Sequence, residues 1–262
     1  MTSSSKVVWS VASVSFREII REKILYNILV IAVLLMGLGF LASRMTYVRP
    51  DRIILDFGVS AVSLSLVAIA SLMGAAVLNR EVERRTMFLA LSRPISRFQF
   101  VAGKYLGLLM ILILNWALVS AVFLGILFLA GGVETNCFSS TLFVALGLLL
   151  LQSWVMAGVA IFFSTISTTS LSAVLAIGVF LIGNNVTQIH TMATKIHSTV
   201  GSWCMGLFGL AVPNLEYFDL GSKVTYGLPV AGHFILIATG YALVVSALLI
   251  TLAGVLIHGK EA

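Results

Sequence analysis

The sequence predicts an all-α integral membrane protein, with an amphipathic helix at the N-terminus followed by six membrane-spanning helices. Of its 262 residues, 60% are hydrophobic and 10% are charged, whereas about a quarter of a typical soluble domain is charged. A span needs about 20 mostly apolar residues. No soluble domain fits between the apolar runs, so residues 1–262 are expected to form a single transmembrane domain. The six predicted spans are Ile24–Ser43, Phe57–Leu78, Tyr105–Ala130, Phe138–Phe163, Ser170–Ile189 and Val230–Ile257.

Residues 1–23, ahead of the first span, form the predicted amphipathic helix. Apolar side chains recur there at helical spacing, and serine and arginine side chains share the opposite face. Such a helix lies in the membrane interface with its apolar side toward the lipid. It either anchors the first span or moves as the protein works, and the sequence leaves both open. The apolar face carries Trp9, Ala12, Phe16, Ile19 and Ile20, and the polar face Ser10, Ser13, Arg17 and Arg21.

The distribution of positive charge predicts the orientation of the chain. With six spans, both termini lie on one side, and eleven Lys and Arg residues fall on that side against five on the other. Because Lys and Arg collect on the cytosolic side of membrane proteins, both termini are expected in the cytosol. The same rule explains the net charge of +6 without a nucleic-acid partner. The five outward residues are Arg44, Arg49, Arg52, Lys195 and Lys223, which makes the Arg44–Arg52 loop unusually basic for an outer one.

The densest group of charges lies between the second and third predicted spans, in a cytosolic loop at residues 79–104. Asn79 can cap a short helix, with Glu81 and Glu83 in its first turn. Pro94 ends that helix, and Ser96 with Gln99 forms a capping box that starts the next span. The loop is either a surface for a soluble partner or a solvated loop that touches anionic lipid. Its charged residues are Arg80, Glu81, Glu83, Arg84, Arg85, Arg93, Arg97 and Lys104.

The longest outer segment is predicted at residues 190–229, and its aromatic side chains are typical of a membrane interface. Pro213-Asn214 ends an apolar piece, Val200–Val212, that is too short to span and predicts an outer-interface or re-entrant helix. Cys137 and Cys204 both fall on the outer side. Two unpaired thiols are expected, although a disulfide between them stays open.

Catalytic signatures are missing from the sequence. It contains no phosphate-binding loop in a strand-to-helix context and neither HExxH nor GxSxG. Its four histidines form no metal-binding pattern, and no metal is expected. No Asp, Glu, Lys or Arg lies deep within a predicted span, which disfavours ion-coupled carriers and favours an external energy source. The chain is therefore expected not to be an enzyme.

A few amides lie within the predicted spans. Their ordinary role is hydrogen bonding between helices, at about 0.6 kcal/mol each, and their functional role would be to line a polar path for a substrate. The sequence favours the structural role but leaves the path open. The candidate path residues are Asn115, Gln152, Asn184, Asn185 and Gln188.

Two stretches resemble a known family. The run from Glu83 through Arg85-Thr86 to Leu91-Ser92-Arg93-Pro94-Ile95-Ser96-Arg97, followed by Gly103-Lys104, resembles the first cytosolic loop of ABC-2 type permeases. The stretch Val212–Asp219, followed by Val224–Gly227, resembles their last outer loop. Arg85 stands where many members have glycine, and the nearest branch includes permeases of multicopper-enzyme maturation systems.

The resemblance implies a permease subunit with the type V exporter-like fold, in a bacterial inner membrane. It would pair with a second copy or a homologous permease, and separate cytosolic ATPase subunits would hold ATP and Mg. The helix Glu81–Leu91 would be the coupling helix that inserts into the ATPase, and family members mostly export. The residues implied at this contact are Glu81, Glu83, Arg84, Arg85, Thr86, Phe88, Leu91, Pro94 and Arg97.

Two rival functions belong to other classes. A membrane scaffold could recruit or assemble a partner complex without moving a solute. An intramembrane enzyme is disfavoured, because no acid, base and nucleophile occur together.

Overall fold

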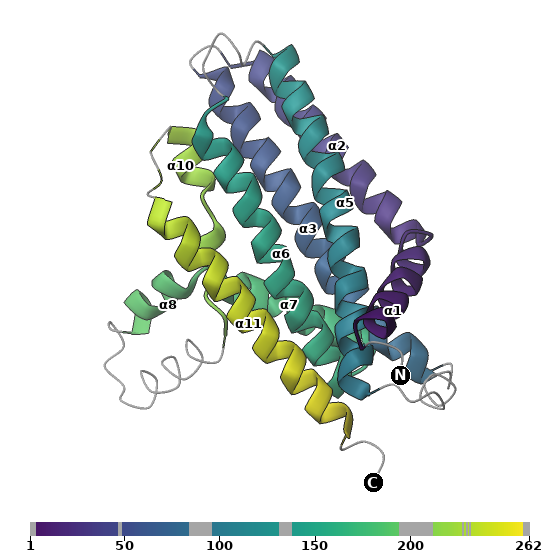
Figure 1. The fold of residues 1–262 in the computed structure, drawn as a ribbon. Helices are drawn as coiled ribbons and strands as arrows, with labels where there is room; N and C mark the ends of the chain where they lie inside the picture. Colours follow the sequence, from purple (N-terminus) through teal and green to yellow (C-terminus); the bar gives the residue numbers. More distant parts are fainter. Residues whose placement is uncertain are drawn as a thin grey trace.

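A computed structural model describes residues 4–46, 49–83, 96–130, 138–193, 212–226, 228, 230 and 232–258. Over these ranges the chain is helical, and no strand occurs in them. The order along the chain is shown in Figure 1. The helices are α1 (Ser4–Ile19), α2 (Lys23–Arg44), α3 (Pro50–Glu83), α5 (Arg97–Leu129), α6 (Ser140–Ile166), α7 (Thr169–Gly183), α8 (Val186–Ala193), the short 3₁₀ helix η1 (Glu216–Phe218), α10 (Gly221–Tyr226) and α11 (Gly232–His258).

Five helices in the described ranges are long and apolar enough to cross a membrane: α2, α3, α5, α6 and α11. They match the first, second, third, fourth and sixth predicted spans. Several run beyond the predicted limits, because helical hydrogen bonding continues past the apolar run. The third span, for example, begins at Arg97 rather than at Tyr105.

The prediction of one continuous fifth span, Ser170–Ile189, is wrong. Helix α7 ends at Gly183 after 15 residues, Asn184 and Asn185 form a turn, and α8 follows at Val186. Two consecutive asparagines favour a break, because their side chains compete for backbone hydrogen bonds. Asn185 shows this directly, since its Nδ2 donates to the carbonyl of Leu181 at 2.8 Å.

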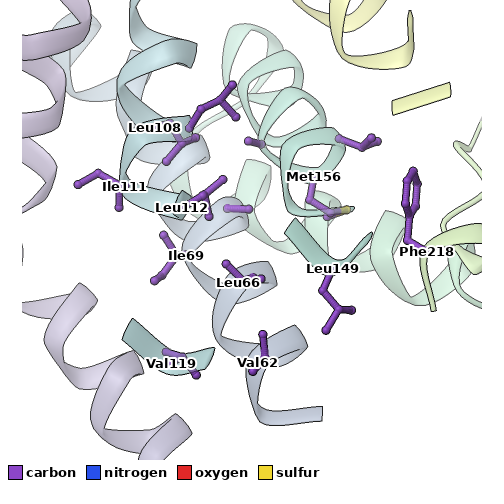
Figure 2. Packing of buried hydrophobic residues seen from close by; sticks show 14 of the residues in the cluster. Val62, Leu66, Ile69, Leu108, Ile111, Leu112, Val119, Leu149, Met156 and Phe218 are labelled. Carbon is purple, nitrogen blue, oxygen red and sulfur yellow. The ribbon is translucent and has the colours of Figure 1, made fainter. Parts of the chain in front are cut away.

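Helices α3 and α6 form the centre of the bundle, and α3 packs against α2, α5, α6, α7 and α10. Gly74 of α3 permits the approach to α6, because a Cβ at this position would lie 2.7 Å from the Cβ of Ala160. Buried side chains of α5 and α6 pack against those of α3 (Figure 2). Those labelled in the figure are Val62, Leu66 and Ile69 of α3, Leu108, Ile111, Leu112 and Val119 of α5, Leu149 and Met156 of α6, and Phe218 of η1.

The amphipathic N-terminal segment is helical, and α1 packs along α5. Gly107 of α5 sets the distance, because a Cβ there would lie 2.8 Å from the carbonyl oxygen of Ala12 and 2.7 Å from the Cβ of Ser15. One turn away, the ammonium of Lys104 lies 3.7 Å from the carboxylate of Glu18, although Lys104 is only 3% exposed. Helix α1 is thus held to α5 by close packing and an ion pair.

The junction between the second and third spans was predicted correctly at one end only. Ser96 and Gln99 form the predicted capping box: the Ser96 hydroxyl accepts from the Gln99 N–H at 3.3 Å, and the Ser96 N–H donates to the Gln99 side chain at 3.2 Å. Asn79, in contrast, caps nothing, because α3 continues through it to Glu83. Glu81 and Glu83 therefore do not lie in the first turn of a new helix.

The two ends of the bundle differ in what they hold (Figure 1). Both termini, the C-terminal end of α3 and the start of α5 lie at the lower end in the figure. The upper end holds the start of α3, the end of α5 and α10. The two helix ends that flank residues 84–95 therefore lie at the same end of the bundle as the start of α1 and the end of α11.

Candidate solute pocket between α3, α6, α7 and α10

A pocket of about 370 Å³ opens between the N-terminal half of α3, the middle of α6, the end of α7 and the start of α10. Most of its polar lining comes from side chains that can accept hydrogen bonds. The residues that line it are Asp56, Val59, Ser60, Ser63, Leu64, Leu149, Gln152, Phe180, Asn184, Asp219, Gly221 and Ser222.

Helix α3 contributes a polar stripe to the pocket. Asp56, Ser60 and Ser63 follow one another at spacings of four and three residues, which places them on one face of the helix. Asp56 and Ser60 are exposed, and Ser63 is partly so. The carboxylate of Asp56 makes no ion pair or hydrogen bond with any residue that the structure describes.

The inner wall of the pocket is an amide pair between α6 and α7. The Gln152 Nε2 donates to the Asn184 Oδ1 at 2.9 Å. Gln152 is 1% exposed, yet its amide oxygen accepts no hydrogen bond from a described residue. The break after α7 positions this pair, because Asn184 is the residue at which that helix ends.

The outer wall is the segment around η1 and α10. Asp219 accepts a hydrogen bond from the Gly221 N–H at 2.9 Å, which fixes its carboxylate at the start of α10. The segment is tied to α7 by the Leu215 N–H, which donates to the Gly183 carbonyl at 3.0 Å. It is tied to α11 by the Asn214 N–H, which donates to the Tyr241 hydroxyl at 2.8 Å. The position of Asp219 therefore depends on the surrounding helices.

The nearest cationic residues in the sequence contact aromatic rings rather than the pocket. Arg52, one turn before Asp56, lies with its guanidinium 4.9 Å from the ring centre of Tyr226. Lys223, one turn after Asp219, lies 5.1 Å from the ring centre of Phe234. Among the residues the structure describes, no Lys, Arg or His lines the pocket.

Of the five candidate path residues, the structure brings two together in this pocket, Gln152 and Asn184. Asn115 is buried between α5 and α3, where its Nδ2 donates to the Ser65 hydroxyl at 3.3 Å. Asn185 and Gln188 are exposed and do not line the pocket. Of these three, Asn115 makes the predicted hydrogen bond between helices, whereas the Asn185 side chain bonds Leu181 of the preceding turn.

Sequence reasoning missed the acidic and hydroxyl part of the lining. Asp56 stands one residue before the predicted start of the second span, and Asp219 ends the Val212–Asp219 stretch. The signal that could have found the α3 stripe is its helical spacing, Asp56, Ser60 and Ser63, within an otherwise apolar helix.

The predicted ATPase contact falls largely outside the described residues. Six of its residues lie in the undescribed range 84–95: Arg84, Arg85, Thr86, Phe88, Leu91 and Pro94. Also outside the described residues are Cys137, Cys204 and, except for Val212, the predicted outer helix Val200–Val212. Glu81 and Glu83 lie at the described end of α3, and Arg97 is the first residue of α5.

Both helix ends beside this segment are attached to the bundle. Near the end of α3, the Asn79 Nδ2 donates to the Ser167 carbonyl at 3.1 Å, and the Ser164 hydroxyl donates to the Ala75 carbonyl at 2.9 Å. These bonds join α3 to the end of α6 and to the turn between α6 and α7. At the start of α5, the attachment is the packing on α1.

The helices and their composition define a multi-pass membrane protein. Comparison with protein families gives the class more closely: the model of the ABC-2 family transporter proteins matches residues 9–203. The chain belongs to this family, whose members are membrane components of ABC transporters rather than catalytic subunits. A search among curated proteins found no match.

Proposed function

We propose that this chain is the membrane-spanning subunit of an ABC transporter that exports a solute. It acts with a second copy or a homologous permease, and cytosolic ATPase subunits that bind ATP and Mg supply the energy. The observation that carries the proposal is the family match over residues 9–203. The Arg85-Thr86 pair in the loop between α3 and α5 supports the proposal that the chain is related to the branch that includes permeases of multicopper-enzyme maturation systems. A bacterial inner membrane with both termini in the cytosol completes the proposal.

Helix α3 can connect the ATPase contact with the pocket. It has 34 residues, so at 1.5 Å per residue it is about 50 Å long. Its end at Glu83 enters the loop that we propose meets the ATPase. Its other end carries Asp56, Ser60 and Ser63 in the pocket. A displacement at one end of such a helix is transmitted to the other.

The loop also acts on other helices through the attachments at its two ends. Asn79 links α3 to the turn before α7. Helix α7 in turn ends at Asn184, which lies in the pocket wall. Gly107 and Lys104 link α5 to α1. ATP-driven closure of the ATPase subunits would therefore shift two pocket helices, α3 and α7, together with the α1–α5 pair.

The test is a charge reversal in the loop, Glu83→Lys with Arg85→Glu. We expect the altered chain to insert in the membrane but to lose co-purification with its ATPase and the ATP turnover that depends on the permease. The matched control reverses a charge pair at the opposite end, Arg49→Glu with Asp51→Lys, whose side chains lie 3.9 Å apart. The control should keep both properties.

Unchanged co-purification of the loop variant would count against the proposal. A scaffold would also bind a partner, so the second readout separates the two functions. A scaffold is indicated if the ATPase binds the intact chain but its ATP turnover is the same with and without it.

A further inference from the structure

We propose that the pocket between α3, α6, α7 and α10 binds the transported solute, and that this solute is an organic cation with an amine or quaternary ammonium group. The inference rests on the proposed function, because it takes the pocket as part of the transport path. It adds the chemical class of the solute, which the family match does not give.

The first argument is charge. Asp56 and Asp219 bring two negative charges into one pocket from separate segments of the chain. Within the described residues, neither carboxylate forms an ion pair. A cleft lined by charges of one sign, with low-dielectric walls, concentrates ions of the opposite sign. The pocket therefore attracts cations.

The second argument is the position of the protein's own cations. Arg52 and Lys223 are close in sequence to the two aspartates, but their charged groups lie over the rings of Tyr226 and Phe234. They do not line the pocket. The aspartates are thus left to face a ligand rather than a neighbouring side chain.

The third argument is hydrogen bonding. Carboxylates accept hydrogen bonds and do not donate them, and an amide oxygen is also an acceptor. Gln152 is buried, and its free amide oxygen adds an acceptor in the wall. It is not among the fully enclosed unpaired atoms of the described structure, so it is open to the pocket. Such a lining matches a ligand rich in N–H donors.

The remaining lining selects an organic cation over a metal ion. Val59, Leu149 and Phe180 provide apolar surface, and an aromatic face attracts ammonium groups. A hard metal ion prefers several oxygen ligands at short range. In the part of the chain that the structure describes, no group of three His, Cys, Asp or Glu residues could hold one. A volume of about 370 Å³ also suits a small organic molecule.

The charge of the pocket can be tested without knowing the solute. Ser60→Cys, in a chain with Cys137→Ser and Cys204→Ser, places a thiol one turn from Asp56. Its reaction rates with cationic trimethylammonioethyl methanethiosulfonate and anionic sulfonatoethyl methanethiosulfonate are measured in the purified full chain in lipid nanodiscs. We expect Asp56→Asn with Asp219→Asn to lower the ratio of cationic to anionic rates roughly tenfold or more.

Two matched variants control this measurement. Asp51→Asn removes the same charge from the same helix outside the pocket and should leave the rate ratio within about twofold of the parent. Asp56→Glu keeps the charge and should retain the ratio. The proposal is overturned if the double asparagine variant keeps the parental ratio, or if Asp51→Asn lowers it as much.

Binding of a cation is then tested with phenethylamine and its neutral counterpart phenylethanol. Phenethylamine should slow the labelling of Ser60→Cys at concentrations at which phenylethanol does not, and the Asp56→Asn, Asp219→Asn background should abolish that difference. Equal protection by both compounds, or by neither, contradicts the proposal. These assays use the permease alone. If the labelling assays fail while the chain still drives ATP turnover, the pocket assignment fails and the transporter assignment stands. If the labelling assays succeed but the chain does not drive ATP turnover, the cation pocket stands and the transporter assignment fails.

Discussion

At the scale of single residues, several close helix contacts in the described part of the chain depend on glycine. Gly107 lets α1 approach α5 until the carbonyl oxygen of Ala12 is 2.8 Å from where a Cβ would be. Backbone atoms cannot swing aside as a side chain can, so a larger residue would force the helices apart. Gly125, on the same helix, has nothing within 4 Å of its virtual Cβ. The two positions therefore provide a matched comparison.

We predict that Gly107→Ala destabilises the chain relative to Gly125→Ala. Both substitutions gain helix propensity, about 1 kcal/mol, but only the first overpacks a contact, at a typical cost of 1–3 kcal/mol. The free energies of unfolding in detergent should differ by roughly 1–3 kcal/mol between the variants. Equal stabilities would show that α1 is not seated on α5 as described.

Part of the candidate pocket could be predicted from residue types alone. Gln152 and Asn184 stand out because amides are rare in apolar spans, and their partnership follows once α6 and α7 are adjacent. Asp56 was not linked to them, because an aspartate near a span end is usually solvated. What joins it to the pocket is the rotation of α3, which places Asp56 on the face that meets α6 and α7, and tertiary packing sets that rotation.

At the scale of elements, long apolar helices were the most predictable feature, since length and hydropathy define them. The Ser96–Gln99 capping box was also predictable, because its hydrogen bonds are local. The two errors have different causes. Asn79 bonds a distant partner, the Ser167 carbonyl, inside a helix that continues, whereas the break at Asn184 follows from two adjacent asparagines, of which Asn185 bonds the backbone locally.

The contact between α6 and α7 leads to a prediction about the Gln152–Asn184 pair. Asn184→Leu should cost roughly 1–2 kcal/mol of unfolding free energy, because it leaves the buried Gln152 amide without its partner. Adding Gln152→Leu should recover part of that loss, since both polar groups are then gone. A double-mutant cycle in detergent is expected to give a coupling of about 0.6–1.7 kcal/mol. Strict additivity would mean that the two amides do not interact.

At the scale of the whole molecule, the predicted orientation rests on the distribution of positive charge. Eleven of sixteen Lys and Arg residues fall on the predicted cytosolic side. The structure places both termini at the end where α3 finishes and α5 begins (Figure 1). The pocket lies nearer the other end, beside α10. An ATPase acting on the loop would therefore reach the pocket mainly through α3.

The orientation of the loop between α3 and α5 decides whether a cytosolic ATPase can act on this chain. We propose labelling with a membrane-impermeant maleimide in intact cells, in a chain with Cys137→Ser and Cys204→Ser. Two single variants are compared: Ser92→Cys in the loop, and Ser140→Cys at the exposed start of α6 at the opposite end. Ser140→Cys should react from outside, whereas Ser92→Cys should react only after the cells are permeabilised. Labelling of Ser92→Cys in intact cells would place the loop outside and contradict its role as the ATPase contact.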